Sequence, residues 1–146
     1  MSATSRFLAY CIALTWPHSG IADTREDQLR AGLAAMERQH YATAMRAWYD
    51  LAAAGDPEAQ HNIGYLYEEG LGVTQQYNVA MEWYRRAADG GLAEAEHNLG
   101  MMYVEGRGAA KSWAQGLIYF RNAADKGLTE SRYMIALSYF EGEGQI

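Results

Sequence analysis

Two histidines lie 36 residues apart, and each is followed directly by an asparagine: His61-Asn62 and His97-Asn98. Imidazole nitrogens bind zinc, so two histidines brought together could share a metal ion. A zinc site needs three or four protein ligands, and no further ligand follows either histidine at metal-binding spacing. The sequence therefore predicts no metal site, and we interpret both histidines as part of a polar, aromatic surface.

Patterns that would support catalysis are also missing from the sequence. No serine, histidine and aspartate stand in an arrangement that would activate a nucleophile. The loops Gly70-Leu71-Gly72 and Gly106-Arg107-Gly108 follow predicted helices rather than strands, and they lack the Lys-Ser/Thr ending of a phosphate loop. We therefore predict no catalytic residue and no cofactor.

Both histidines belong to a longer pattern with a period of 36 residues. Residues 95–100, Ala-Glu-His-Asn-Leu-Gly, are matched by residues 59–64, Ala-Gln-His-Asn-Ile-Gly. A fixed period in this range is typical of a repeat architecture.

Each repeat contains two predicted helices. Their boundaries follow from the helical spacing of apolar residues and from residues that favour helix starts and ends. Asp56 can cap the free amides of a helix, Pro57 suits its first turn, and Gly70 can take the left-handed conformation that ends it. We predict helices and no strands, at residues 25–38, 41–54, 57–69, 76–89, 93–105, 112–125 and 129–141.

Gly64 and Gly100 fall inside predicted helices, where glycine costs about 1 kcal/mol relative to alanine. We interpret them as points where the partner helix comes so close that a side chain would clash, and Ala136 takes the same position in the next repeat. Four aromatic residues of the second helices are expected to face these small residues from the core: Trp83, Tyr84, Tyr119 and Phe120.

The whole pattern closely resembles the Sel-1-like repeat, a relative of the tetratricopeptide repeat. The residues of the first copy that carry the resemblance are Ala59, Ile63, Gly64, Tyr67, Gly70, Gly72, Ala80, Trp83, Tyr84, Arg85, Arg86, Ala87, Ala88 and Gly91. The resemblance implies repeats at residues 57–92 and 93–128 and a partial repeat at 129–146. Residues 23–56 lack the Gly-x-Gly loop and look more like a tetratricopeptide helix pair that caps the N-terminus.

The resemblance further implies an all-α, right-handed α-solenoid of stacked antiparallel helix pairs, whose concave surface binds other proteins. On that geometry, the residues expected to contact a partner are Leu29, Leu33, His61, Tyr65, Glu68, His97, Met101, Val104, Tyr133 and Leu137.

Charge narrows the class of partner. The net charge of −6 argues against nucleic acid. The first helices of the two repeats carry glutamates and no lysine: Glu58, Glu68, Glu69, Glu94 and Glu96. We therefore expect a basic or apolar peptide or protein segment rather than an acidic one.

The N-terminus has the layout of a secretory signal peptide over residues 1–22. An apolar run from Phe7 to Trp16 ends at Pro17, small residues follow, and charge begins at Asp23. This predicts a periplasmic or secreted protein; the alternative is an N-terminal helix of a cytoplasmic protein. Cys11 is the single cysteine, which excludes an internal disulfide framework. No stretch reaches the roughly 18 apolar residues that a membrane-spanning helix needs.

We therefore predict a non-enzymatic interaction scaffold of the cell envelope. One alternative is a secreted enzyme acting on cell-wall or small-molecule substrates, like the family's penicillin-binding-like subgroup, although this chain lacks that subgroup's paired cysteines. Another alternative is a self-assembling structural subunit. The last predicted helix is expected to leave Met134, Leu137 and Tyr139 partly uncovered, which predicts a fragment of a longer repeat array, an end that pairs with a partner, or two copies packed there.

Overall fold

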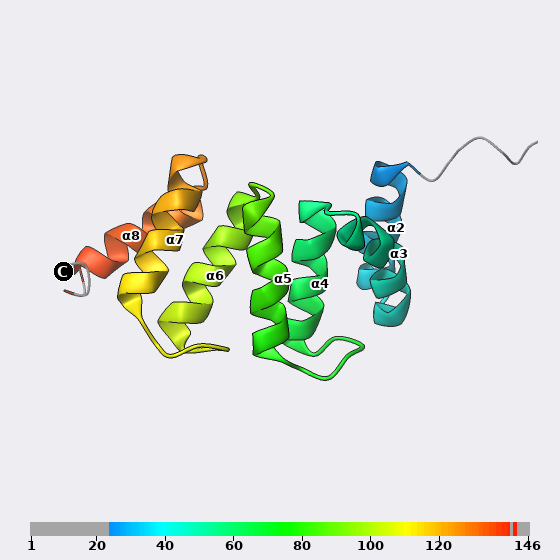
Figure 1. Ribbon diagram of the computed structural model, residues 1–146, viewed down its shortest axis with the longest axis horizontal. Coiled ribbons are helices and arrows are strands. Elements are labelled where there is room, and N and C mark those ends of the chain that lie inside the picture. Colours follow the sequence, from blue (N-terminus) through cyan, green and yellow to red (C-terminus); the bar gives the residue numbers. More distant parts are fainter. Residues whose placement is uncertain (1–23, 141, 143–146) are drawn as a thin grey trace, which may run out of the picture.

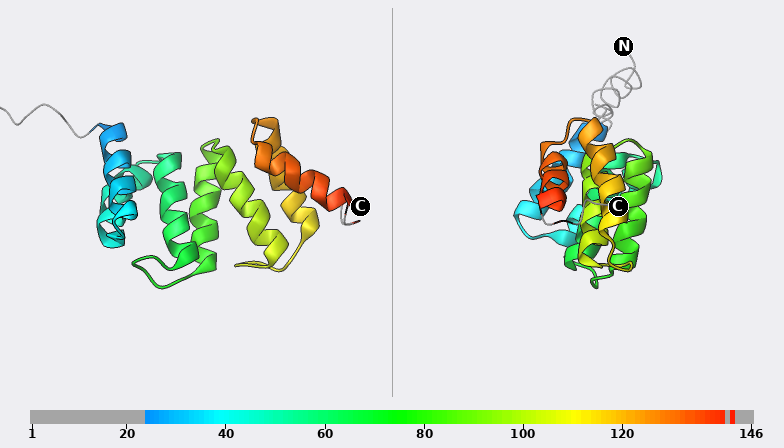
Figure 2. Two further views of the ribbon diagram at one scale, coloured as in Figure 1. Left: turned by 180° about the vertical axis from the view of Figure 1, so that it is seen from behind. Right: turned by 90° about the vertical axis from the view of Figure 1, so that its left-hand side faces the viewer.

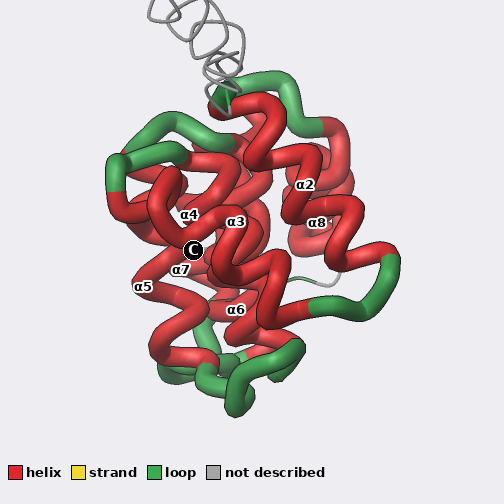
Figure 3. Tube along the Cα trace, turned by 90° about the vertical axis from the view of Figure 1, so that its right-hand side faces the viewer, coloured by secondary structure: helices red, strands yellow, loops and turns green. Residues whose placement is uncertain are grey.

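The computed structural model describes residues 24–140 and 142, and these residues form helices joined by loops, without a strand (Figure 3). The helices are α2 (Arg25–Glu37), α3 (Tyr41–Ala53), α4 (Pro57–Glu69), α5 (Tyr77–Asp89), α6 (Ala93–Glu105), α7 (Trp113–Asp125) and α8 (Thr129–Phe140). The predicted all-α fold is confirmed, and each predicted boundary lies within one residue of the observed one. The predicted signal peptide, residues 1–22, lies outside the described residues.

Local hydrogen bonds explain where the helices begin and end. A side-chain oxygen of Asp56 accepts from the backbone N–H of Ala59 at 2.9 Å, and Gly70 ends α4 with a φ of 68°. Ser112 was expected inside α7 but caps it instead, because its hydroxyl accepts from the N–H of Gln115 at 3.2 Å.

The helices are stacked in a row, and each packs on the helix before it and the helix after it. Helices α2, α4, α6 and α8 form one layer, and α3, α5 and α7 form the other (Figures 1 and 2). We call α2, α4, α6 and α8 the first helices, and their outer side the first-helix face. Each helix pair hides part of its apolar surface against its own partner and the rest against its neighbours.

The predicted close approach at the mid-helix glycines is confirmed. A Cβ built on Gly64 would lie 2.8 Å from the Tyr84 ring, and a Cβ on Gly100 would lie 2.5 Å from the Phe120 ring. Both rings are fully buried. The large-into-small packing of second helix against first helix therefore holds in both repeats.

The expectation that all four aromatic residues are core is wrong for two of them, since Trp83 and Tyr119 are only partly buried. The Arg86 guanidinium lies 4.8 Å from the centre of the Trp83 ring. Tyr119 stacks on Tyr103 at 5.6 Å between ring centres. Each ring sits one position before the buried ring of its helix, and so turns toward the edge of the core.

Candidate functional site

The ten residues predicted to contact a partner differ in exposure. Three are exposed: Leu33, Tyr65 and Tyr133. Four are partly exposed: His61, His97, Met101 and Leu137. The remaining three are buried, with exposed fractions of 7–8%: Leu29, Glu68 and Val104. Those three therefore do not form part of an exposed contact surface, which corrects the sequence-based prediction.

Neighbouring helices explain the burial of the two apolar residues among these three. Leu29 belongs to the core around α2, α3 and α4, and its carbonyl accepts a hydrogen bond from Trp48 at 3.2 Å. Val104 lies against α7, where its methyl group would be 2.7 Å from a Cβ added to Gly116. Both side chains thus point toward a second helix rather than toward the first-helix face.

Glu68 is buried because it joins two repeats. Its carboxylate accepts a hydrogen bond from the Tyr84 hydroxyl at 2.6 Å and forms an ion pair with Arg107 at 2.6 Å. Arg107 lies in the loop after α6 and also pairs with Glu105. Burial and the Glu68 carboxylate raise the pKa of Tyr84, so its hydroxyl keeps its proton and donates. This cluster of side chains links two successive repeats.

The two histidines link successive first helices instead of sharing a metal ion. The His61 ring packs on Tyr84 with 5.4 Å between ring centres, and its Nε2 lies 3.0 Å from Asn98 Nδ2 on α6. One repeat later, Nδ1 of His97 lies 2.8 Å from the Ser131 hydroxyl on α8. The sequence analysis did not identify Ser131. Its hydroxyl replaces the alanines found in the same repeat position, Ala59 and Ala95, and this change indicated a possible hydrogen bond.

Burial is the main influence on both imidazoles. It lowers the pKa of His61, and the carboxylate of Glu94 acts in the opposite direction more weakly. It also lowers the pKa of His97, against a weaker opposing effect of Glu130. Both rings are therefore neutral at pH 7 and can accept hydrogen bonds.

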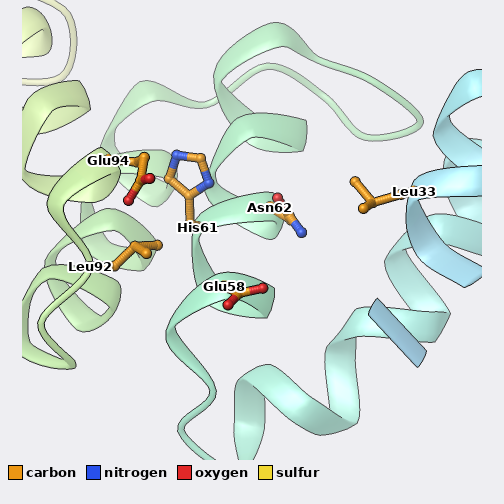
Figure 4. Close-up of a pocket in the computed structure, with 6 residues that line it drawn as sticks. All are labelled: Leu33, Glu58, His61, Asn62, Leu92 and Glu94. Carbon is orange, nitrogen blue, oxygen red and sulfur yellow. The ribbon is translucent and has the colours of Figure 1, made fainter. Parts of the chain in front are cut away.

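Two hollows open on the first-helix face. One, of about 290 Å³, lies between α2, α4 and α6, where the side chains of His61 and Glu94 lie beside each other and Leu33 approaches from α2 (Figure 4). The other, of about 440 Å³, lies between α4, α6 and α8. Its lining residues are His61, Tyr65, Glu94, His97, Asn98, Leu128 and Glu130.

Exposed carboxylates recur along these hollows with the period of the repeat, at Glu58, Glu94 and Glu130. Glu58 is paired with Arg25 at 3.0 Å. The sequence analysis assigned Glu68 and Glu96 to the same negative surface. Both are instead buried and form ion pairs, Glu68 with Arg107 and Glu96 with Lys126. The negative character of the larger hollow therefore comes from Glu94 and Glu130.

Within residues 24–140 and 142, no three histidine, cysteine, aspartate or glutamate side chains come together as a possible metal site. No helix in the same part of the chain is long and apolar enough to cross a membrane.

Comparison with known proteins identifies the repeat. The family model described as the Sel1 repeat matches residues 57–92 and again residues 93–128. A solved Sel1 repeat protein from Oxalobacter formigenes superposes with a TM-score of 0.73 at 34% identity over 77% of this chain. A protective antigen of uropathogenic Escherichia coli with an SLR fold, c5321, superposes with a TM-score of 0.72 at 25% identity over 84% of it. This chain spans 46% and 28% of those two structures, respectively. No match was found among curated proteins.

Proposed function

Because this chain is a Sel1 repeat protein over residues 57–128, we propose that it is an interaction module that holds a basic or apolar segment of a partner protein. Proteins of this repeat family are typically scaffolds for protein–protein interaction and generally not enzymes. The proposal places the partner in the hollows of the first-helix face, where successive repeats present their side chains in a row.

The larger hollow is the observation that carries this proposal. It brings together the Tyr65 ring, which is 40% exposed, and the exposed carboxylates of Glu94 and Glu130. A lysine or arginine of the partner would find two carboxylates there and an aromatic face for cation–π contact. An acidic segment would be repelled, and apolar neighbours of the cation would pack on Tyr65 and Leu128.

A peptide selection tests the proposal. Residues 23–146 are immobilised and panned against a random peptide library, and we expect the selected peptides to combine lysine or arginine with apolar residues. The Glu94→Gln/Glu130→Gln variant should bind the selected peptides about fivefold more weakly, which is ~1 kcal/mol for two carboxylates at an exposed site. The Asp50→Asn/Asp125→Asn variant is the matched control, because it removes two exposed charges from the other layer. Selection of acidic peptides, or an equal loss in both variants, would contradict the proposal.

We also propose that the protein is exported, on the sequence of residues 1–22 alone. Fusing those residues to alkaline phosphatase, which is active only after export, gives the test. An active fusion is expected, and the Leu14→Arg change should abolish the activity by interrupting the apolar run. Activity that survives this replacement would count against a signal peptide.

A further inference from the structure

The two hollows on the first-helix face are copies of each other, one repeat apart. Five residues that line the smaller hollow have a counterpart 36 positions later in the lining of the larger one. The pairs are Glu58 and Glu94, His61 and His97, Asn62 and Asn98, Leu92 and Leu128, and Glu94 and Glu130. The preceding first helix adds one apolar side chain to each hollow, Leu33 or Tyr65. Two hollows with the same lining can bind the same kind of side chain twice, at a distance that the stacking of the repeats sets.

Each hollow offers an exposed carboxylate to a cation. In the smaller hollow Glu94 lies beside the histidine ring (Figure 4), and Glu130 takes the equivalent position in the larger one. Among residues 24–140 and 142, neither glutamate forms an ion pair. Glu58, the first member of this row, shows what such a carboxylate binds, because Arg25 of this chain pairs with it at 3.0 Å. Two further cations are therefore needed to complete the row.

The distance between the two carboxylates is set by the width of a helix. First helices lie side by side, as the 3.0 Å contact of His61 with Asn98 shows, and a helix with its side chains is about 10–12 Å wide. In a polyproline II segment every third side chain returns to the same side after about 9 Å, and the flexible stem of a lysine spans the difference. In a β-strand the side chains on one side lie about 7 or about 14 Å apart, which does not match.

An α-helix matches this distance with cations seven positions apart, since each residue rises about 1.5 Å. Such an occupant would have to hold a short helix together, and isolated helices shorter than about 12–15 residues are marginal in water. Polyproline II is instead a major conformer of unfolded chains. The larger hollow also presents the Tyr65 ring, which is 40% exposed, and proline-rich segments dock on aromatic side chains. These properties favour the extended segment.

We propose that the two hollows together bind one polyproline II segment of a partner protein, in which two lysine or arginine residues stand three positions apart with proline between them. One cation lies against Glu94 and the other against Glu130, and proline packs on Tyr65. This inference rests on the proposed function and adds the conformation and spacing of the bound segment. A second copy of residues 1–146 does not supply it, because no two of their 12 lysines and arginines are three positions apart.

Peptides that differ in the spacing of two lysines test the proposal. Three fluorescein-labelled peptides of equal length and composition, rich in proline, place the lysines two, three or four positions apart, and an alanine-rich helical peptide places them seven apart. Their anisotropy is followed as the full chain is added. The peptide with lysines three apart should bind at least about twofold more tightly than the others, because wrong spacing leaves one exposed ion pair unmade.

Two further comparisons isolate the cause of that preference. It should disappear in the Glu94→Gln/Glu130→Gln protein and persist in the Asp50→Asn/Asp125→Asn protein, which loses two exposed charges from the other layer. Replacing the prolines of the best peptide by glycine should weaken its binding at least about twofold, because glycine loses more conformational freedom when the segment is fixed.

Several results would overturn this inference while leaving the proposed function in place. They are equal binding of the peptides with lysines two, three and four apart, tightest binding of the helical peptide, a spacing preference that survives Glu94→Gln/Glu130→Gln, and equal binding of the glycine peptide. If none of the basic peptides binds, the proposed function is contradicted as well.

Discussion

Nδ2 of Asn98 lies 3.0 Å from Nε2 of His61, so a hydrogen bond on the hollowed face joins the first helices of two successive repeats. His97 and Ser131 make the equivalent link one repeat further along, at 2.8 Å. A neutral imidazole can accept a hydrogen bond at one ring nitrogen, whereas a protonated one can only donate. The link between His61 and Asn98 is therefore coupled to the protonation of His61, whereas the Ser131 hydroxyl can also accept a hydrogen bond from a protonated His97.

This coupling predicts a pH dependence of stability. Burial lowers the pKa of His61 and His97 in the folded chain, so near pH 6.5 the unfolded chain binds more protons. Their contribution is fully present above about pH 6.5 and is lost as the pH falls through the lowered pKa. We expect the free energy of unfolding by urea to decrease from about pH 7.5 to about pH 5.5.

The His61→Gln/His97→Gln variant provides the control for that experiment. Glutamine can still hydrogen-bond to Asn98 and Ser131 but does not titrate, so the decrease should become smaller. Equal slopes for both proteins between these pH values would mean that the histidines do not cause the effect.

Gly100→Ala should destabilise the protein although alanine is the better helix former. The intrinsic gain is about 1 kcal/mol, and forcing a methyl group into a packed core costs about 1–3 kcal/mol. The new Cβ would lie 2.5 Å from a fully buried ring, so overpacking should win. Urea unfolding of Gly100→Ala, Phe120→Leu and the double variant checks this. The double variant should lose less than the sum of the single changes, and strict additivity would contradict direct contact.

Much of this fold was readable from the sequence because its determinants are local. Capping by Asp56, the left-handed Gly70 and the helical spacing of apolar residues all act within a few positions, and they set the helix boundaries. The contact of Gly100 with Phe120 was also predictable, because a costly mid-helix glycine recurs in register with an aromatic residue.

The site was less predictable because its contacts cross repeat boundaries. Glu68 looked like a surface carboxylate, but Arg107, 39 positions away, buries it. The period of the sequence assigns a residue to a position in the repeat, and it does not reveal which side chain of the next repeat reaches that position. Leu29 and Val104 were misplaced for a different reason, because each points toward the second helix of its own pair, Leu29 toward Trp48 and Val104 toward Gly116.

Arg107→Leu should be among the most destabilising changes at a partly exposed residue. It leaves the carboxylate of Glu68, which is 7% exposed, without its cation, and breaking such a pair costs on the order of 2–4 kcal/mol. The Glu68→Gln/Arg107→Leu variant should recover part of this loss, because a neutral amide can still accept from Tyr84 and carries no charge. Thermal unfolding compares the two variants. A double variant less stable than Arg107→Leu alone would contradict the argument.

Glu96 lacks a hydrogen bond that the residues in the equivalent position of α4 and α8 make. Gln60 donates from Nε2 to the carbonyl of Ala52 at the end of α3, at 3.0 Å, and Arg132 donates to Ala124 in the same way, at 3.4 Å. Glu96 takes the equivalent position but has no donor for the carbonyl of Ala88. Its Oε1 pairs with Lys126 at 3.0 Å, and its Oε2 is buried without a hydrogen-bond partner.

Glu96→Gln should therefore stabilise the chain by about 1 kcal/mol, the usual net value of a hydrogen bond that replaces an unsatisfied buried group. The amide would donate to Ala88, and the lost ion pair costs little because the Lys126 side chain is 38% exposed. The reverse change, Gln60→Glu, should destabilise by a similar amount, because it places a carboxylate beside the negative end of α3. If urea unfolding shows Glu96→Gln to be the less stable protein, the pair with Lys126 outweighs the missing donor. The position would then be specialised in the second repeat for joining α6 to the end of α7.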